Sequence, residues 1–136
     1  MKILIVDDEK NNRQVLAQIM APFGEYDFAK DGREALEIFQ LAIEDKTPYQ
    51  LVLLDIMMPI MNGQEALFAM RAFEKEKGYS GSKETSIFIV SALDTEKQVV
   101  EAFFKGGCTD YITKPIIRSH LLAKLREYHL IPAETP

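Results

Sequence analysis

The segment Leu51-Val52-Leu53-Leu54-Asp55-Ile56-Met57-Met58-Pro59 is an apolar run that ends at a carboxylate and then reaches a proline. Consecutive apolar residues between turn signals are typical of a strand buried on both faces, as a parallel sheet requires. Asp55 would then lie at the carboxyl end of this strand, where open α/β sheets place their ligand crevices. The alternative interpretation of a single aspartate here is a cap on the next turn.

Length and composition indicate a single globular domain. The chain has 136 residues, of which 27% are charged and 47% hydrophobic, and its formal net charge is −5. The negative charge argues against direct binding of nucleic acid. The first apolar run, residues 3–6, is too short for a signal peptide or a membrane span. The single cysteine, Cys108, excludes an internal disulfide, so we expect a cytoplasmic protein with Cys108 as a packing residue.

Strand-like and helix-like segments alternate along the whole chain. The predicted strands are residues 2–6, 26–29, 51–54, 87–90 and 111–113. Apolar residues at helical spacing predict helices from Asn11 or Asn12 to residue 23, from Gly32 to residue 43, and over 66–73, 99–104 and 121–128. The polar segment 74–85 is expected to be a flexible loop. This alternation predicts an α/β fold: a doubly wound, five-stranded parallel sheet with helices on both faces.

Polar residues follow four of the five predicted strands. Asp7 and Asp8 follow the first strand, Asp55 the third, Ser91 the fourth and Lys114 the fifth. Because the carboxyl ends of parallel strands meet at one edge of the sheet, we expect these side chains to lie close together. Three carboxylates in one crevice repel each other unless a cation neutralises them.

The chemistry of these groups favours Mg²⁺ as that cation, with Mn²⁺ as the alternative ion. Mg²⁺ prefers hard oxygen ligands and binds through one or two carboxylates, and no histidine or cysteine accompanies these acids. His120 and His129 lie on or after the last predicted helix, and we interpret both as surface residues.

The segments at the strand ends resemble the receiver domains of two-component response regulators. They are residues 3–9 (ILIVDDE), 54–59 (LDIMMP) with Gly63, 90–92 (VSA) and 106–115 (GGCTDYITKP). Each segment alone is a weak motif, but their combination in this order and spacing is specific and covers nearly the whole chain. The resemblance implies the flavodoxin-like strand order 2-1-3-4-5, in a stand-alone protein of the chemotaxis-receiver type.

The resemblance also implies a function and the residues that carry it. Asp55 would accept a phosphoryl group from the phosphohistidine of a sensor histidine kinase or a histidine phosphotransfer protein. Asp8, assisted by Asp7 and by the backbone carbonyl of Met57, would bind Mg²⁺ together with Asp55. Lys114 would neutralise charge on the transferring group. Such a protein is a signalling domain and not an enzyme, since it promotes only its own phosphorylation and dephosphorylation.

Output is expected to depend on Ser91 and Tyr111. By the same resemblance, these residues would switch partner binding on the face formed by the fourth helix (99–104), the fifth strand and the fifth helix. The Lys114–Pro115 peptide bond would be cis. Apolar groups at Met57 and Leu93 would slow self-dephosphorylation.

Two other classes share parts of this pattern. A flavodoxin-type nucleotide-binding module needs a glycine-rich phosphate loop after the first strand, where Asp7-Asp8-Glu9 would repel phosphate. An aspartate-nucleophile phosphatase normally has a general acid two residues after the nucleophile, and Met57 cannot donate a proton. We therefore expect a receiver domain over residues 1–129, then a short tail over 130–136, with no output domain and no membrane contact.

Overall fold

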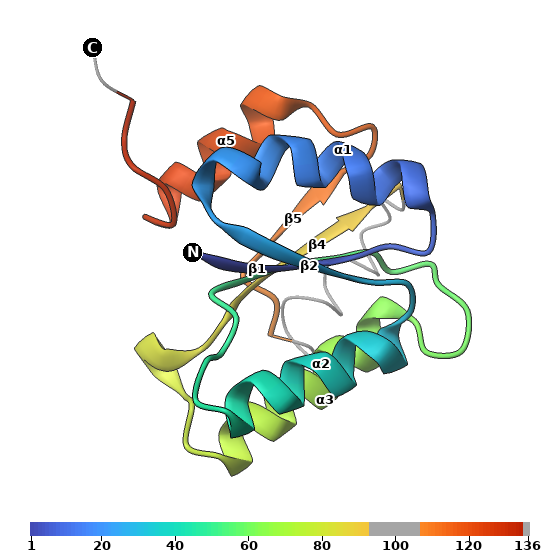
Figure 1. Cartoon of the computed structure of the whole chain (residues 1–136), viewed down its shortest axis with the longest axis vertical. Coiled ribbons are helices and arrows are strands. Elements are labelled where there is room, and N and C mark those ends of the chain that lie inside the picture. The colour runs from blue at the N-terminus through green and yellow to red at the C-terminus, as the bar shows by residue number, and fades with distance from the viewer. Residues whose placement is uncertain (93–106, 135–136) are drawn as a thin grey trace.

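A five-stranded parallel sheet lies at the centre of the protein (Figure 1). The computed structural model describes residues 1–92 and 107–134. The strands are β1 (Lys2–Val6), β2 (Glu25–Ala29), β3 (Leu51–Leu54), β4 (Ser86–Ser91) and β5 (Asp110–Thr113). They pair in the order β2-β1-β3-β4-β5, and every pair is parallel. The predicted α/β class and the order 2-1-3-4-5 are both confirmed.

Helices cover both faces of the sheet, with α1 and α5 on one side and α2 and α3 on the other (Figure 1). They are α1 (Lys10–Met20), α2 (Gly32–Glu44), α3 (Gly63–Glu76) and α5 (Arg118–Glu127), with 3-10 turns η1 (Ala21–Phe23) and η2 (Gly81–Lys83). The helix predicted over 99–104, like Leu93, lies outside the described residues.

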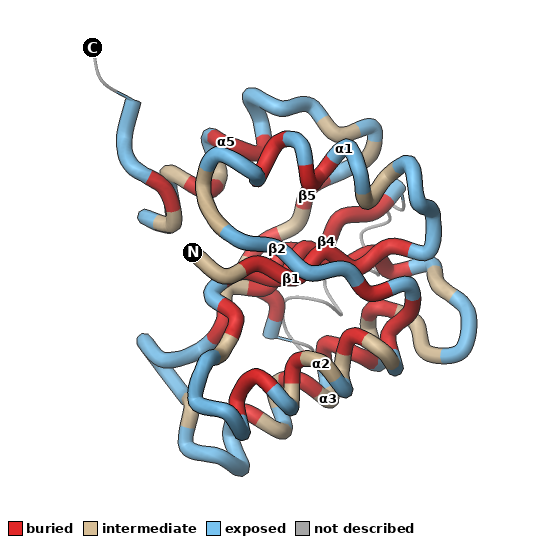
Figure 2. Tube along the Cα trace, in the orientation of Figure 1, coloured by how far each residue is buried: buried red, intermediate tan, exposed pale blue. Residues whose placement is uncertain are grey.

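Alternate residues of the central strands enter two different cores. In β1, Ile3 and Ile5 pack against the cluster under α1 and α5, whereas Leu4 and Val6 pack against the cluster under α2 and α3. All four residues of β3 are fully buried, and Figure 2 shows the buried residues gathered along the central strands. A strand with both faces buried can place polar groups only at its ends, which fixes the functional edge.

Two apolar residues of the helix predicted to run to residue 23 are not fully buried. Val15 is 45% exposed, because the buried stripe of α1 at helical spacing is formed by Leu16, Ala17, Ile19 and Met20. Phe23 is only partly buried and lies in the turn η1, after the α-helix has ended at Met20.

The expectation of a loose loop over 74–85 is also wrong at both of its ends. Helix α3 continues to Glu76, and the side chain of Glu74 is buried at 1% exposure. Its carboxylate accepts a hydrogen bond from the backbone N–H of Thr85 at 2.7 Å and one from Nη1 of Arg71 at 2.7 Å. The buried carboxylate at the start of the segment thus binds the backbone at its end and the preceding turn of α3, which anchors a loop that its polarity predicted to be flexible.

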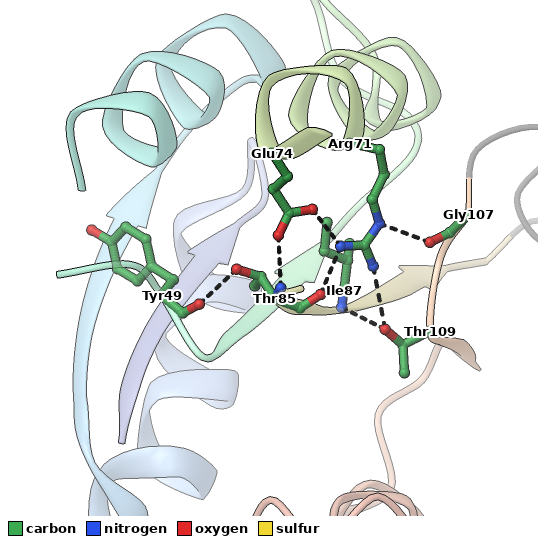
Figure 3. A network of polar contacts seen from close by, with 7 residues as sticks. All are labelled: Tyr49, Arg71, Glu74, Thr85, Ile87, Gly107 and Thr109. Carbon is green, nitrogen blue, oxygen red and sulfur yellow. Dashed lines mark hydrogen bonds and ion pairs between the residues drawn. The ribbon is translucent and has the colours of Figure 1, made fainter. Parts of the chain in front are cut away.

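Arg71 extends this network to the start of β5 (Figure 3). Its Nε donates to the carbonyl of Gly107 at 2.8 Å, while its Nη1 also donates to the carbonyl of Thr85 at 2.8 Å. The Thr85 hydroxyl in turn donates to the carbonyl of Tyr49 at 2.7 Å. The network joins the segments that precede β3, β4 and β5 at the amino edge of the sheet. The polar residues that follow the strands lie at the opposite, carboxyl edge.

Several smaller expectations can be compared with the structure. Cys108 is buried, and His120 and His129 are exposed, as predicted. Ile131 is buried with the core cluster under α5, and Leu130 packs against that cluster, so the packed chain reaches two residues beyond residue 129. No helix among the described residues is long and apolar enough to cross a membrane.

Gly63 provides a test of how tightly the chain after β3 is packed. A Cβ at this position would clash with the Asp55 carbonyl oxygen, so Gly63→Ala must displace backbone and should cost about 3 kcal/mol. Gly81 has φ of +63° but open space around it, so Gly81→Ala should cost about 1–2 kcal/mol from backbone conformation alone. Urea denaturation of both variants measures the difference, and equal losses would contradict the close approach.

Candidate functional site

The carboxyl edge of the sheet positions the polar residues predicted from the strand ends. Asp7 and Asp55 directly follow β1 and β3, and the backbone N–H of Asp55 donates to the carbonyl of Val6 at 3.0 Å. On the other side, the backbone N–H of Lys114 donates to the carbonyl of Ser91 at 3.0 Å. Because these hydrogen bonds continue the strand pairing, the side chains are directed by the sheet itself.

Three carboxylates meet at this edge. Asp7, Asp8 and Asp55 each offer one oxygen, and these three oxygens lie within 4.8 Å of one another. Asp7 and Asp55 are buried at 1% and 3% exposure, whereas Asp8 is exposed. The Lys114 Nζ lies 2.8 Å from Oδ2 of Asp7 and 3.5 Å from Oδ2 of Asp55. The structure thus brings together all four of these predicted residues.

Burial and crowding change the protonation of the site. Burial raises the pKa of Asp55 to about 6; the Lys114 ammonium opposes this shift, and the nearby charge of Asp7 adds to it. For Lys114, burial lowers the pKa, but its hydrogen bond to Asp7 and the charges of Asp55 and Asp7 outweigh burial, so the net shift is upward. The lysine is therefore a fixed positive charge beside a carboxylate that ionises close to neutral pH.

This set of groups fits a small divalent cation. Within the described part of the chain, Asp7 and Asp55 form ion pairs with Lys114 alone, and Asp8 forms none. One ammonium cannot neutralise three carboxylates, two of which are buried. The donors are all carboxylate oxygens, the type that Mg²⁺ prefers, and the exposed Asp8 leaves the cluster open to solvent.

The chain after β3 folds closely around Asp55. The Gly63 backbone N–H donates to the Ile56 carbonyl at 2.9 Å, and Asn62 caps α3 in a capping box with Glu65. The backbone N–H of Met57 hydrogen-bonds the Asp55 carboxylate and lowers its pKa, against the larger effect of burial. The Met57 side chain is 64% exposed. The role predicted for the Met57 carbonyl as a metal ligand stays a prediction.

Ser91 and Tyr111 do not occupy equivalent places. Ser91 is buried as the last residue of β4 and pairs with Thr113, so it reaches the functional edge. Tyr111 is partly buried and pairs with Ile89, two positions back from that edge. The Lys114–Pro115 peptide bond is cis, as predicted.

One contributor to the site was missed in the sequence. Nη1 of Arg13, in α1, donates to the backbone carbonyl of Asp7 at 2.8 Å, and the Glu9 N–H donates to the Asp7 carboxylate at 2.9 Å. These contacts hold the turn between β1 and α1. An arginine one turn into the helix that follows the acids was the available signal, but helical spacing alone assigns it to the surface.

Comparison with known proteins agrees with this geometry. The model of the response regulator receiver domain family matches residues 3–126. The chain belongs to this family. It is therefore a signalling domain of two-component systems.

The relatives include proteins of very different length. Over 136 aligned residues the chain is 32% identical to the transcriptional regulatory protein HprR of Escherichia coli, covering 96% of this chain and 54% of HprR. It is 30% identical to the rice two-component response regulator ORR41, covering 93% of this chain and 94% of ORR41. It is 32% identical to hybrid signal transduction histidine kinase I of Dictyostelium discoideum, covering 85% of this chain and 6% of the kinase. The chain thus spans about half or less of the kinase and HprR.

Solved structures of receivers are similar across the whole fold. A CheX–CheY–BeF₃–Mg²⁺ complex from Borrelia burgdorferi matches with a TM-score of 0.80 and 29% identity, covering 94% of this chain and 88% of that one. The complex of Ypd1 with the Ssk1 receiver domain from Saccharomyces cerevisiae matches with a TM-score of 0.78 and 28% identity, with the same coverage. Receivers in these complexes bind protein partners.

The raised pKa of Asp55 predicts a pH-dependent gain of stability in Asp55→Asn. Folding raises the pKa from 3.8 to about 6, so stability present below about pH 4 is lost as the pH rises through 6. Asparagine does not ionise, and in EDTA at pH 7.5 the variant should therefore be more stable by on the order of 1–3 kcal/mol. Thermal melts between pH 4 and 8 should show the gain shrinking toward low pH.

Asp8→Asn is the matched control for this series, because Asp8 belongs to the same cluster but is exposed. Its effect on stability should be smaller. A gain in Asp55→Asn that is constant across the pH range would contradict the prediction.

Proposed function

We propose that Asp55 accepts a phosphoryl group from a phosphohistidine on a sensor histidine kinase or a histidine phosphotransfer protein. The observation that carries this proposal is a buried carboxylate that lies within reach of two further carboxylates and of the Lys114 ammonium. A carboxylate can act as a nucleophile when its charge and position are controlled. With a pKa of about 6, Asp55 is largely ionised at neutral pH and able to attack phosphorus.

Asp7, Asp8, Asp55 and the backbone carbonyl of Met57 are the proposed ligands of Mg²⁺ or, as the alternative, Mn²⁺. When bound, the ion would neutralise charge on the transferring phosphoryl oxygens. The exposed position of Asp8 beside two buried acids supports this assignment, since one side of the ion must remain open to the phosphoryl group.

Lys114 and Ser91 are proposed to bind the phosphoryl oxygens on Asp55. The Lys114 Nζ is already 3.5 Å from the Asp55 carboxylate, so it can neutralise added charge without a large movement. The buried Ser91 hydroxyl lies at the same edge. The protein would promote only its own phosphorylation and dephosphorylation, and the apolar Met57 side chain would limit access of water.

Output is proposed to follow from Ser91 and Tyr111. Phosphoryl oxygens on Asp55 would attract the Ser91 hydroxyl as a hydrogen-bond donor. Movement of Ser91 toward them would leave space for the Tyr111 ring to turn inward. Partners would read the face of β5, α5 and residues 99–104. The receiver unit is proposed to span residues 1–129 and to act in the cytoplasm, either in a phosphorelay or by direct binding of a target.

Acetyl phosphate with Mg²⁺ should add one phosphoryl group to the protein, detected by intact-mass spectrometry. Asp55→Asn should remain unlabelled because it lacks the nucleophilic carboxylate. An unchanged mass of the wild type, or equal labelling of the variant, would refute the proposed acceptor.

The same assay tests the metal ligands when Mg²⁺ is titrated. Asp8→Asn removes a ligand charge at an exposed position and should raise the half-saturating Mg²⁺ concentration about tenfold or more. Asp31→Asn is the control: this aspartate caps α2 and is not among the three clustered acids, so its Mg²⁺ requirement should match that of the wild type.

Ser91→Ala should separate phosphorylation from output. The variant keeps Asp55, so beryllofluoride with Mg²⁺ should still bind, but the NMR signals of the Tyr111 ring should move less than in the wild type. If the Tyr111 signals of wild type and Ser91→Ala responded identically to beryllofluoride, Ser91 would have no part in the switch.

A further inference from the structure

A polar cluster links α5 to β5 directly beneath Tyr111. Asp110, the first residue of β5, is buried at 7% exposure. Its Oδ1 accepts the backbone N–H of Tyr111 at 2.7 Å, and its Oδ2 accepts the hydroxyl of Tyr128 at 2.8 Å and Nζ of Lys124 at 3.0 Å. Three donors therefore fix this carboxylate in one orientation.

Tyr128 makes the α5 side of the cluster rigid. Its ring packs edge-on against Phe88 of β4 with centroids 5.5 Å apart, and its hydroxyl also lies 3.2 Å from the Thr109 carbonyl. Burial and the hydrogen bond to Asp110 raise the pKa of Tyr128 to about 12, so it remains a donor at neutral pH. The carboxylate to which Lys124 binds is thus held from both elements.

Lys124 reaches from one face of the sheet to the other. Residues alternate along β5, so Asp110 and Ile112 face α5, and Ile112 packs in the core on that side. Tyr111 points to the opposite face and packs against the other core. The Lys124 Nζ nevertheless lies 5.8 Å from the centre of the Tyr111 ring. Because β5 is an edge strand, a long side chain can pass around it and contact both faces.

We propose that Lys124 is a positioning residue that holds the Tyr111 ring in its partly buried position and thereby opposes the switch at Asp55. The inference rests on the proposed function, since it assigns a counterweight to the movement of Tyr111. Asp110 fixes the ammonium, and the ammonium attracts the face of the ring. Turning the ring inward, away from the strand edge, breaks this attraction.

The size of the effect follows from the contact. A cation over an aromatic ring at a partly exposed site contributes about 0.5–1 kcal/mol, which corresponds to a two- to fivefold change in an equilibrium. Coupling between two sites is reciprocal, so the same factor must appear in the affinity of Asp55 for a phosphoryl mimic. Loss of the Lys124 ammonium should therefore tighten binding of the phosphoryl mimic at Asp55. The ion pair of Lys124 is with Asp110, whereas Asp7 and Asp55 pair with Lys114.

The test is a titration of the full chain with beryllofluoride in saturating Mg²⁺, followed by NMR of the Tyr111 ring. Lys124→Met keeps the length of the side chain and removes the charge. We expect it to bind beryllofluoride about two- to fivefold more tightly. Before beryllofluoride is added, its Tyr111 signals should already be displaced toward their bound positions. Lys124→Arg keeps a cation that can bind Asp110, and it should behave as the wild type.

Lys77→Met is the matched control, because the Lys77 Nζ lies over the Phe73 ring at 5.5 Å, at the end of α3 and away from β5. It removes the same type of contact and should leave beryllofluoride affinity unchanged. Circular dichroism checks that all variants are folded.

The outcomes separate the two proposals. If the wild type binds beryllofluoride and Lys124→Met binds it with the same affinity, the role of Lys124 is wrong while the acceptor site stands. Equal tightening in Lys77→Met would also overturn it, by showing a general effect of lost charge. If the wild type fails to bind beryllofluoride, the acceptor site itself fails and this inference fails with it.

Discussion

Repulsion among three carboxylates at the carboxyl edge of a parallel sheet is the constraint on which the site depends. The strands deliver Asp7, Asp8 and Asp55 to one point because they run in the same direction. The central residues of these strands are buried on both faces, so charged side chains can be placed only at the strand ends. Among the described residues, the only ammonium that forms ion pairs with Asp7 and Asp55 is that of Lys114, which directly follows β5. The parallel direction of the strands therefore brings both the acids and the lysine to the site.

The crowding of these carboxylates lowers the stability of the protein at neutral pH. Contacts of the surrounding backbone hold the acids in place despite this cost. The close approach of Gly63 to the Asp55 carbonyl and the capping box of α3 hold the loop in place. The contact from Arg13 to the Asp7 carbonyl does the same for the first turn. Sites that store unfavourable charge in this way are poised to respond when a ligand relieves the charge. Under the proposed function the signal is a change in charge at Asp55, to which a site of this kind would respond.

The sequence predicted the fold and the cluster well, because both follow from local patterns. Apolar runs that stop at Asp7 and Asp55 mark buried strands and their ends without any knowledge of contacts. Other features depend on partners far apart in the chain, which periodicity does not encode. The offset that pairs Tyr111 with Ile89 is set by strand register, and burial of Glu74 requires donors from Arg71 and Thr85. Polarity suggested a free loop there because the pairing is visible only in three dimensions.

The ion pair between the buried Glu74 and the partly buried Arg71 limits which substitutions this sequence can accept. Replacement of Arg71 alone would leave Glu74 as an uncompensated buried charge, a defect that typically costs about 3–5 kcal/mol. Replacement of Glu74 alone would leave the partly buried Arg71 without its carboxylate partner. An apolar replacement of both residues would remove the charges but would also leave the carbonyls of Gly107 and Thr85 without their donor. We therefore expect Glu74 and Arg71 to be retained together in related sequences. The exposed residues between Glu74 and Thr85 should tolerate substitution better than these two anchoring residues.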